Sequence, residues 1–212
     1  QENEDEDMFT RRLADELEAM ILKEGPDTIA AFFTEPIMGS GGVIVPPDTY
    51  YEKIQVVLKK YDILLVADEV ITAFGRTGNM FGTTTMKLVP DMIVCAKGLS
   101  SAYLPISALM INERVFKEMS EKSDEIGVFG LTFTYSGHPV SAKVAIETLK
   151  IYEEKNIVEH VRQMEPFLLN GLRELSYHPL IGEIRGKGLL AGVELVANKK
   201  TKKAFDPKLG VG

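Results

Sequence analysis

Apolar and charged residues alternate at helical spacing over the first part of the chain. After an acidic lead, Gln1 to Asp7, apolar residues stand at positions 9, 13, 17, 20 and 21 with charged residues between them. This spacing predicts an amphipathic helix, and Gly25-Pro26 marks its end. The apolar run over residues 28–34 is then typical of a buried strand.

Helix and strand patterns continue to alternate after residue 39. A loop rich in Gly and Pro leads to Thr49, which with Glu52 three residues later predicts a capping box for a helix that ends at Lys60. Three short apolar runs follow, at residues 63–67, 92–96 and 106–111. Such runs are typical of strands buried on both faces of a parallel sheet. The pattern therefore predicts an α/β fold.

Longer helical patterns occupy the second half of the chain. They cover about residues 140–154 and 157–176, after which apolar runs at 181–185 and 189–196 flank Gly186-Lys187-Gly188. The flanked glycines predict a β-hairpin. We therefore expect residues 1–155 to belong to a large domain. Residues 156–212 are expected to form an interdomain helix and the start of a small C-terminal α+β domain.

Composition narrows the classes of function. The chain has 24 basic and 31 acidic residues, a net charge of −7 and a pI near 5.1. This balance argues against nucleic-acid binding, because phosphate contacts need clustered Lys and Arg. The apolar runs are too short to span a bilayer, so no membrane partner is expected. One cysteine, Cys95, and three scattered histidines predict neither a disulfide framework nor a metal site, and we expect a cytoplasmic location.

Charged side chains follow two of the predicted strands. Asp68-Glu69 comes directly after the run 63–67, and Lys97 follows the run 92–96. In open α/β sheets, ligands bind at the carboxyl ends of the strands. Taken singly, Asp68 could cap a helix and Lys97 could be a solvated surface charge. Taken together, they match the needs of pyridoxal phosphate: a lysine that forms a Schiff base with a carbonyl, and an acid that pairs with the pyridinium nitrogen.

The same residues belong to an ordered set of motifs. The set comprises the run Asp68–Gly78 (DEVITAFGRTG), Pro90-Asp91, the run Ala96–Ser101 (AKGLSS), Glu35-Pro36-Ile37 followed by Gly41-Gly42, and the run Phe133–Pro139 (FTYSGHP). In this order the motifs resemble those of the class III aminotransferases, the ω-aminotransferase group of fold-type I pyridoxal phosphate enzymes. The resemblance covers nearly the whole chain. It implies a fold-type I large domain, in which a mostly parallel sheet has helices on both of its faces, and pyridoxal 5'-phosphate as the cofactor.

The resemblance also implies roles for individual residues near the predicted strand ends. It makes Lys97 the catalytic residue, as Schiff-base lysine and proton shuttle, and Asp68 the partner of the pyridine nitrogen. Val70 is expected against one face of the cofactor ring. Glu35 matches a glutamate on the cofactor and substrate side, with a strand-end surface acid as the alternative.

Phe133 and Thr134 carry an implication about assembly. Thr134 matches a threonine that reaches the cofactor phosphate of the neighbouring subunit, and Phe133 stands beside it. The resemblance therefore implies a homodimer with shared active sites. Without the resemblance, Thr134 would be a loop hydroxyl and nothing more.

The motifs that begin at Lys97 and Phe133 look most like those of pyruvate-dependent ω-aminotransferases, including those that act on 4-aminobutyrate. The implied reaction is a ping-pong transfer of an amino group from an ω-amino acid or primary amine to a keto acid, with pyruvate as the expected acceptor. One alternative is a fragment or truncated, non-catalytic dimerising module, because the chain ends before the small-domain arginine expected to receive the substrate carboxylate. Another is a different fold-type I enzyme, such as an aminomutase.

Overall fold

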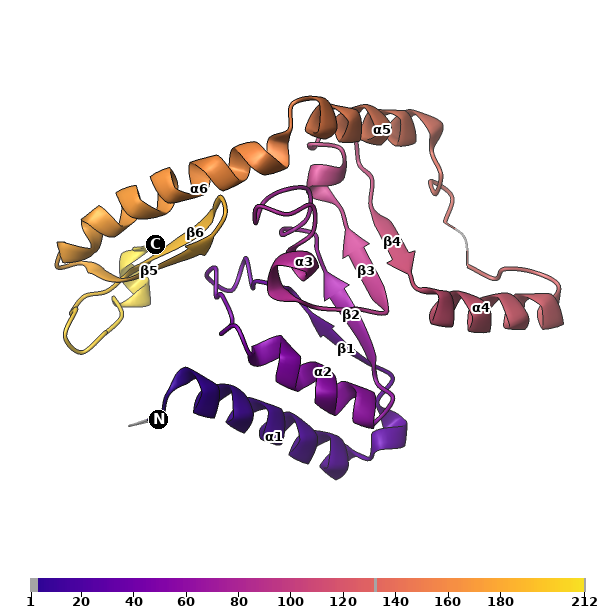
Figure 1. Ribbon diagram of the computed structural model, residues 1–212, viewed down its shortest axis with the longest axis horizontal. Helices are drawn as coiled ribbons and strands as arrows, with labels where there is room; N and C mark the ends of the chain where they lie inside the picture. The colour runs from indigo at the N-terminus through magenta and orange to yellow at the C-terminus, as the bar shows by residue number, and fades with distance from the viewer. Residues whose placement is uncertain (1–3, 132, 212) are drawn as a thin grey trace.

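The computed structural model describes residues 4–131 and 133–211 (Figure 1). A four-stranded sheet lies at the centre of the described chain, and a two-stranded hairpin packs against the last long helix. In chain order the helices and strands are α1 (Glu6–Glu24), β1 (Ala31–Thr34), α2 (Tyr50–Lys60), β2 (Leu64–Asp68), α3 (Gly82–Met86), β3 (Met92–Cys95), β4 (Ala108–Ile111), α4 (Glu113–Ile126), α5 (Pro139–Glu154), α6 (Ile157–Arg173), β5 (Ile181–Lys187) and β6 (Leu190–Leu195).

The central sheet is mostly parallel, which confirms the predicted α/β class. Its strand order is β1-β2-β3-β4, with β1, β2 and β3 parallel and β4 antiparallel to β3. The connection from β3 to β4 contains the three-residue 3₁₀ turn η2 (Lys97–Leu99) and no crossover helix, so β4 returns beside β3 in the opposite direction. The prediction of strands buried on both faces fails for β4, where Leu109 is 56% exposed.

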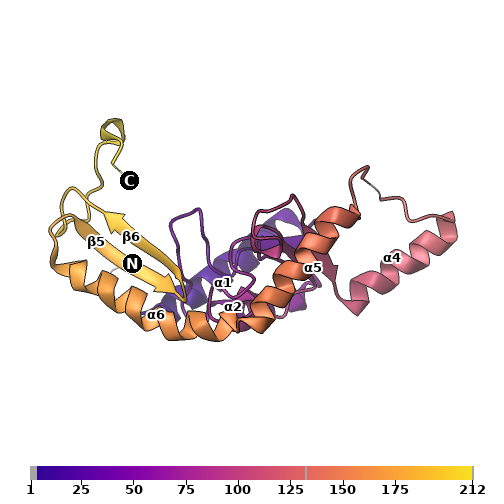
Figure 2. The ribbon, with the colours of Figure 1, turned by 90° about the horizontal axis from the view of Figure 1, so that it is seen from above.

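The main core lies between the sheet and the helix pair α1 and α2. Ile21 of α1, Ile54 of α2 and Leu65 of β2 are buried in one cluster, and α1 runs alongside α2 in both ribbon views (Figures 1 and 2). Burying one such side chain stabilises the fold by roughly 1.5–3 kcal/mol. The predicted first helix is confirmed. It ends at Gly25, whose positive φ of 93° and N–H bond to Ile21 O close the last turn.

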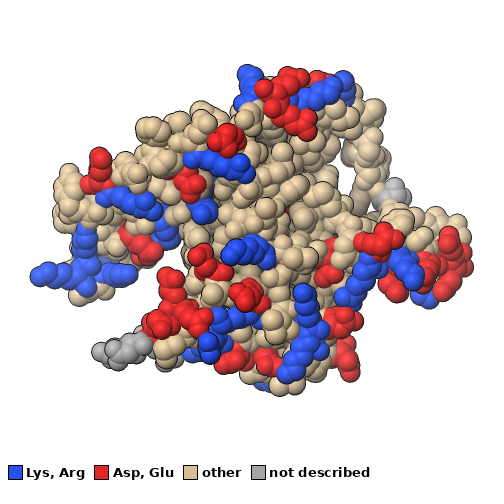
Figure 3. Space-filling model, in the orientation of Figure 1, with Lys and Arg blue, Asp and Glu red and all other residues tan. Residues whose placement is uncertain are grey.

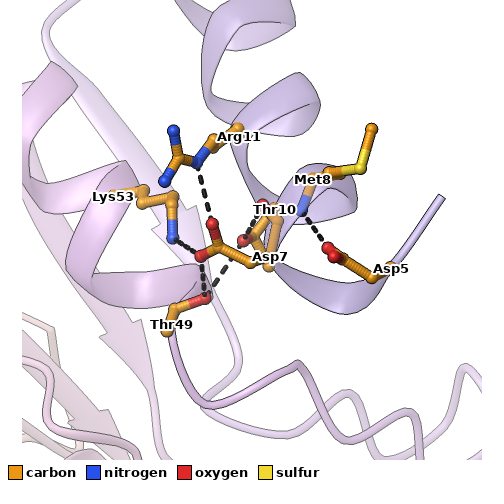
Figure 4. Close-up of polar contacts among 7 residues, drawn as sticks. All are labelled: Asp5, Asp7, Met8, Thr10, Arg11, Thr49 and Lys53. Carbon is orange, nitrogen blue, oxygen red and sulfur yellow. Dashed lines mark hydrogen bonds and ion pairs between the residues drawn. The ribbon is translucent and has the colours of Figure 1, made fainter.

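The N-terminal ends of α1 and α2 are joined by polar contacts (Figure 4). The Asp7 carboxylate accepts hydrogen bonds from Arg11 Nε at 2.8 Å and from Lys53 Nζ at 2.5 Å. These two bonds, with Lys53 the larger cause, hold the pKa of Asp7 below its usual value. Thr10 and Thr49 hydroxyls meet beside this pair at 3.1 Å. These contacts therefore fix the position of the N-terminal end of α2 relative to that of α1.

The predicted capping box at Thr49 is wrong. Its backbone is already helical, with φ −92° and ψ −3°, and its side chain makes no capping bond to α2. The hydroxyl instead faces Thr10 and Asp7 on α1. A tertiary contact has therefore replaced the local one that the spacing of Thr49 and Glu52 suggested.

The hairpin predicted near Gly188 is confirmed and contacts the central part of the chain. Gly188 has a φ of +61°, and a Cβ atom there would lie 2.4 Å from Arg76 O. Leu189 N donates to the same Arg76 oxygen at 3.0 Å. The tip of the hairpin thus packs directly on the backbone of the turn that contains Arg76. The proposed boundary between residues 155 and 156 stays a prediction.

Acidic and basic side chains are interspersed over the visible face of the molecule (Figure 3). Many of them form ion pairs along single helices, as Lys143 and Glu147 do on α5. Within residues 4–131 and 133–211, no helix combines the length and apolar character needed to cross a membrane.

Candidate active site

The three parallel strands bring three of the predicted site residues to one edge of the sheet. Thr34 of β1 pairs with Ala67 of β2, so Glu35 and Asp68 stand next to each other at the strand ends. Asp68 in turn pairs with Val94 of β3, three residues before Lys97. The parallel register therefore gathers Glu35, Asp68 and Lys97 at the carboxyl end of the sheet, the usual ligand-binding edge of this architecture.

Asp68 is half-buried and keeps one carboxylate oxygen available. Its Oδ1 atom accepts a hydrogen bond from Val70 N at 3.0 Å. In the described part of the chain, Oδ2 has no hydrogen-bond partner. The alternative role as a helix cap is wrong, because residues 70–81 form turns and bends and the next helix, α3, begins only at Gly82. Asp68 can thus accept a hydrogen bond from a bound group while its own backbone turn orients it.

Glu69 has a structural role that its place in the sequence did not predict. Its side chain is fully buried, and its carboxylate accepts bonds from Thr72 Oγ1 at 2.6 Å, Gly82 N at 2.8 Å and Thr83 N at 2.6 Å. Both ends of the loop from Asp68 to α3 are thereby tied to one carboxylate. The signal was present in the Asp68-Glu69 pair, because adjacent residues of an extended segment point to opposite sides.

Lys97 is exposed and begins the turn η2 with a φ of +40°. Such a left-handed conformation is unfavourable for a residue with a side chain and persists only where neighbouring structure holds it. Among the described residues, its amine has no hydrogen bond or ion pair. The lysine is therefore free to react or to bind a partner at the sheet edge.

Glu35 is tied to its own loop. Its Oε2 atom accepts from Gly39 N at 2.8 Å, and its carbonyl oxygen accepts from the buried Tyr51 hydroxyl at 2.5 Å. Burial raises the pKa of Tyr51, so this phenol stays a neutral donor. A Cβ atom on Gly39 would lie 2.6 Å from Ile71 Cδ1. The loop of Glu35 therefore packs closely against the loop that follows Asp68.

Phe133 and Thr134 lie apart from this cluster. They are exposed residues of the segment between α4 and α5, at the right of Figure 1, whereas Lys97 lies at the end of β3. Segments 104–107, 133–138 and 140–142 line an open hollow of about 1400 Å³. The described chain thus does not bring Thr134 to the edge that carries Asp68 and Lys97.

The donor set at the sheet edge fits pyridoxal 5'-phosphate. The free Lys97 amine can bind an aldehyde carbon, and the free oxygen of Asp68 can accept the N–H of a protonated ring nitrogen. Val70 comes from the turn that orients Asp68 and could contact the ring. No residue of this set needs to break an existing side-chain bond to take its role, because Asp68 Oδ2 and Lys97 Nζ have no other partner in the described residues.

Comparison with known proteins identifies a family. The family model described as "Aminotransferase class-III" matches residues 1–211. A curated relative from Oryza sativa subsp. indica, "Probable gamma-aminobutyrate transaminase 3, mitochondrial", is 55% identical over 99% of this chain and 41% of its own length. The chain therefore spans about two fifths of the length of this curated relative. The name of the relative specifies mitochondria, whereas a cytoplasmic location is expected from the residues of this chain.

Solved transaminase structures have the same fold. One, described as "Transaminase with L-ala", has a TM-score of 0.95 and 57% identity, covering 98% of this chain and 49% of the other. Another, the ω-transaminase from Pseudomonas jessenii in complex with PMP, has a TM-score of 0.94 and 55% identity over 96% of this chain and 45% of its own.

The buried bonds of Glu69 lead to a stability prediction. Glu69→Gln replaces one of the two acceptor oxygens with an amide donor, which would face either the Thr83 N–H or the Gly82 N–H and the Thr72 hydroxyl. We expect the free energy of unfolding, measured with urea, to fall by about 2–3 kcal/mol. Thr72→Val, which removes one donor and keeps the carboxylate, should cost only about 1 kcal/mol. Equal stability of Glu69→Gln and the unmodified protein would contradict the assigned role.

Proposed function

Because this chain belongs to the class-III aminotransferase family, we propose that the protein transfers an amino group from an ω-amino acid or primary amine to a keto acid. One observation carries the proposal: a lysine amine and a carboxylate oxygen, both without partners in the described residues, stand at the ends of neighbouring parallel strands. An amino-group transfer through pyridoxal phosphate needs both groups.

Asp68, Lys97 and Glu69 would each have a different role at the cofactor. When bound, pyridoxal 5'-phosphate supplies an aldehyde that exchanges amines and a ring that withdraws electrons from the bond being broken. Asp68 would keep the ring nitrogen protonated by accepting its N–H at Oδ2. Lys97 would bind the aldehyde carbon through Nζ and, once displaced by the substrate amine, would take and return the proton at that atom. Glu69 would keep the Asp68 loop in place throughout.

For the substrates, we propose 4-aminobutyrate or a similar ω-amino acid as donor and pyruvate as acceptor. A relative that is 55% identical to this chain over 210 residues is named a probable gamma-aminobutyrate transaminase, which supports the donor. A solved transaminase that is 57% identical is described with L-alanine, the amino acid that pyruvate becomes on amination. Both findings support an exchange between these two compounds.

For the assembly, we propose a homodimer in which Thr134 and Phe133 of one subunit complete the site of the other. The segment 127–138 contains no Asp, Glu, Lys or Arg, and Figure 3 shows few charged side chains there. It exposes large apolar side chains, with Phe133 69% and Tyr135 84% accessible. A contiguous apolar surface of this kind is typical of a protein interface.

The role of Lys97 predicts where the cofactor attaches. In the full-length protein mixed with pyridoxal 5'-phosphate, borohydride reduction should add the cofactor's mass to the peptide that contains Lys97. Lys97→Ala should abolish this labelling, the visible absorbance of the lysine-bound cofactor and turnover. Lys59→Ala, which removes an exposed lysine of α2, is the matched control and should leave all three unchanged. Labelling that persists in Lys97→Ala would exclude the assignment.

The acceptor is tested by product analysis. With 4-aminobutyrate as donor, the full-length enzyme should form alanine from pyruvate about tenfold faster than it forms glutamate from 2-oxoglutarate, because a site built for the small acceptor excludes the added carboxylate. Chromatography of the amino acids measures both rates. A preference for 2-oxoglutarate would overturn the choice of acceptor and leave the transaminase assignment intact.

Shared active sites predict recovery of activity when two defective subunits are mixed. We expect Lys97→Ala and Thr134→Val homodimers to have little activity when assayed alone. Hybrids of the two place both defects in one site and leave the other site intact. Random pairing should therefore restore about a quarter of the wild-type sites. If Thr134 acts within its own subunit, every hybrid site has one defect and activity should not recover.

A further inference from the structure

A tyrosine of α5 holds the turn that carries Lys97. The Tyr152 hydroxyl donates to Gly98 O at 2.6 Å and lies 2.9 Å from Ser101 Oγ. Gly98 directly follows Lys97, so the carbonyl that Tyr152 fixes belongs to the next peptide unit. Tyr152 lies far along the chain, on the helix that packs against η2. The contact therefore couples a separate element of the fold to the backbone of the lysine.

The backbone around Lys97 needs such a restraint. Lys97, Ser101 and Ala102 have positive φ angles of 40°, 48° and 63°, although none of them is glycine. Residues with a side chain rarely adopt this region unless surrounding contacts over-determine it. Within the turn itself, Leu99 N donates to Ala96 O at 2.9 Å, whereas the bonds Ser100 N to Lys97 O and Ser101 N to Gly98 O are long, at 3.3 and 3.4 Å. The Gly98 carbonyl therefore receives its shorter bond, of 2.6 Å, from Tyr152.

Phe74 closes the other side of the same turn. Its ring stacks on that of Tyr152, with centroids 6.1 Å apart and planes inclined by 26°. A Cβ atom on Gly98 would lie 2.9 Å from Phe74 Cδ2, so the ring lies directly against the Gly98 backbone. Phe74 belongs to the loop that starts at Asp68 and is anchored by Glu69. Tyr152 and Phe74 thus hold the Lys97 turn between α5 and the Asp68 loop.

We propose that Tyr152 is a positioning residue for Lys97, which acts by fixing the Gly98 carbonyl and thereby the left-handed backbone of the lysine. The φ angle of Lys97 sets the direction of its Cα–Cβ bond and so the region that Nζ can reach. Without the hydroxyl, the Gly98 carbonyl loses its tyrosine donor and the turn relaxes toward an ordinary negative φ. This inference rests on the proposed role of Lys97 in amino-group transfer.

Tyr152→Phe in the full-length holoenzyme tests the proposal, because it removes the hydroxyl and keeps the ring that stacks on Phe74. Misplacing a reacting group affects the chemical step more than substrate binding. We expect kcat to fall about tenfold or more while KM for the amine donor stays within about twofold. In the cofactor-free protein, amide hydrogen exchange over residues 98–102 should become faster. Ser101→Ala, which removes only the second partner of the hydroxyl, is the control and should keep kcat within about twofold.

Two results would overturn the proposal. One is a Tyr152→Phe enzyme with wild-type kcat, even if its melting temperature is lower, because a purely structural role predicts that pattern. The other is an equal loss of kcat in Ser101→Ala, which would assign the effect to the contact between Ser101 and Tyr152 and not to the hydrogen bond between Tyr152 and Gly98. Failure of the proposed function has a different signature: the unmodified enzyme would not attach pyridoxal 5'-phosphate at Lys97. Hydrogen exchange in the cofactor-free protein would then still report whether Tyr152 holds the turn.

Discussion

A carboxylate buried away from water has to find its hydrogen-bond donors inside the protein, and Glu69 finds them in the loop that follows Asp68. The hydroxyl of Thr72 and the N–H groups of Gly82 and Thr83 all converge on it. That convergence determines the path of a loop that has little regular secondary structure. The ring of Phe74 and the turn at Arg76 both belong to this loop.

The direction of the strands is the second feature that positions the residues of the candidate site. Three parallel strands must end at the same edge, so residues far apart in sequence meet there without any specific contact between them. The lysine needs more than this, because its left-handed backbone is intrinsically unfavourable. The sheet brings Lys97 to the right edge, whereas side chains from α5 and from the Asp68 loop hold its conformation. The sheet topology thus determines where Lys97 lies, and the neighbouring side chains determine its backbone conformation.

The sequence was sufficient to predict an element where its local pattern agrees with its tertiary packing. The helix α1, the strands β1 to β4 and the β5–β6 hairpin follow from periodicity and glycine positions. The positions of Asp68 and Lys97 after their predicted strands place both residues at the same edge of the sheet, as the structure does. Sequence reasoning failed where a distant partner decides the outcome. The Thr49 hydroxyl contacts α1 and does not cap its own helix. Strand β4 runs antiparallel to β3 because the connection between them contains no crossover helix. Glu69 accepts hydrogen bonds from residues that are up to 14 positions away in the sequence. None of these partners is encoded in the neighbouring residues.

Gly188 lies so close to the backbone of Arg76 that the tip of the β5–β6 hairpin is an internal joint and not a free surface loop. Hairpin tips are ordinarily the places where insertions, tags and grafted loops are tolerated. Here, a longer tip would displace the turn at Arg76, which belongs to the loop that begins at Asp68. Chimaeras that exchange the C-terminal part between relatives should therefore transfer residues 75–78 and the hairpin tip as one unit. Recombination points placed between them would separate two segments that pack directly on each other.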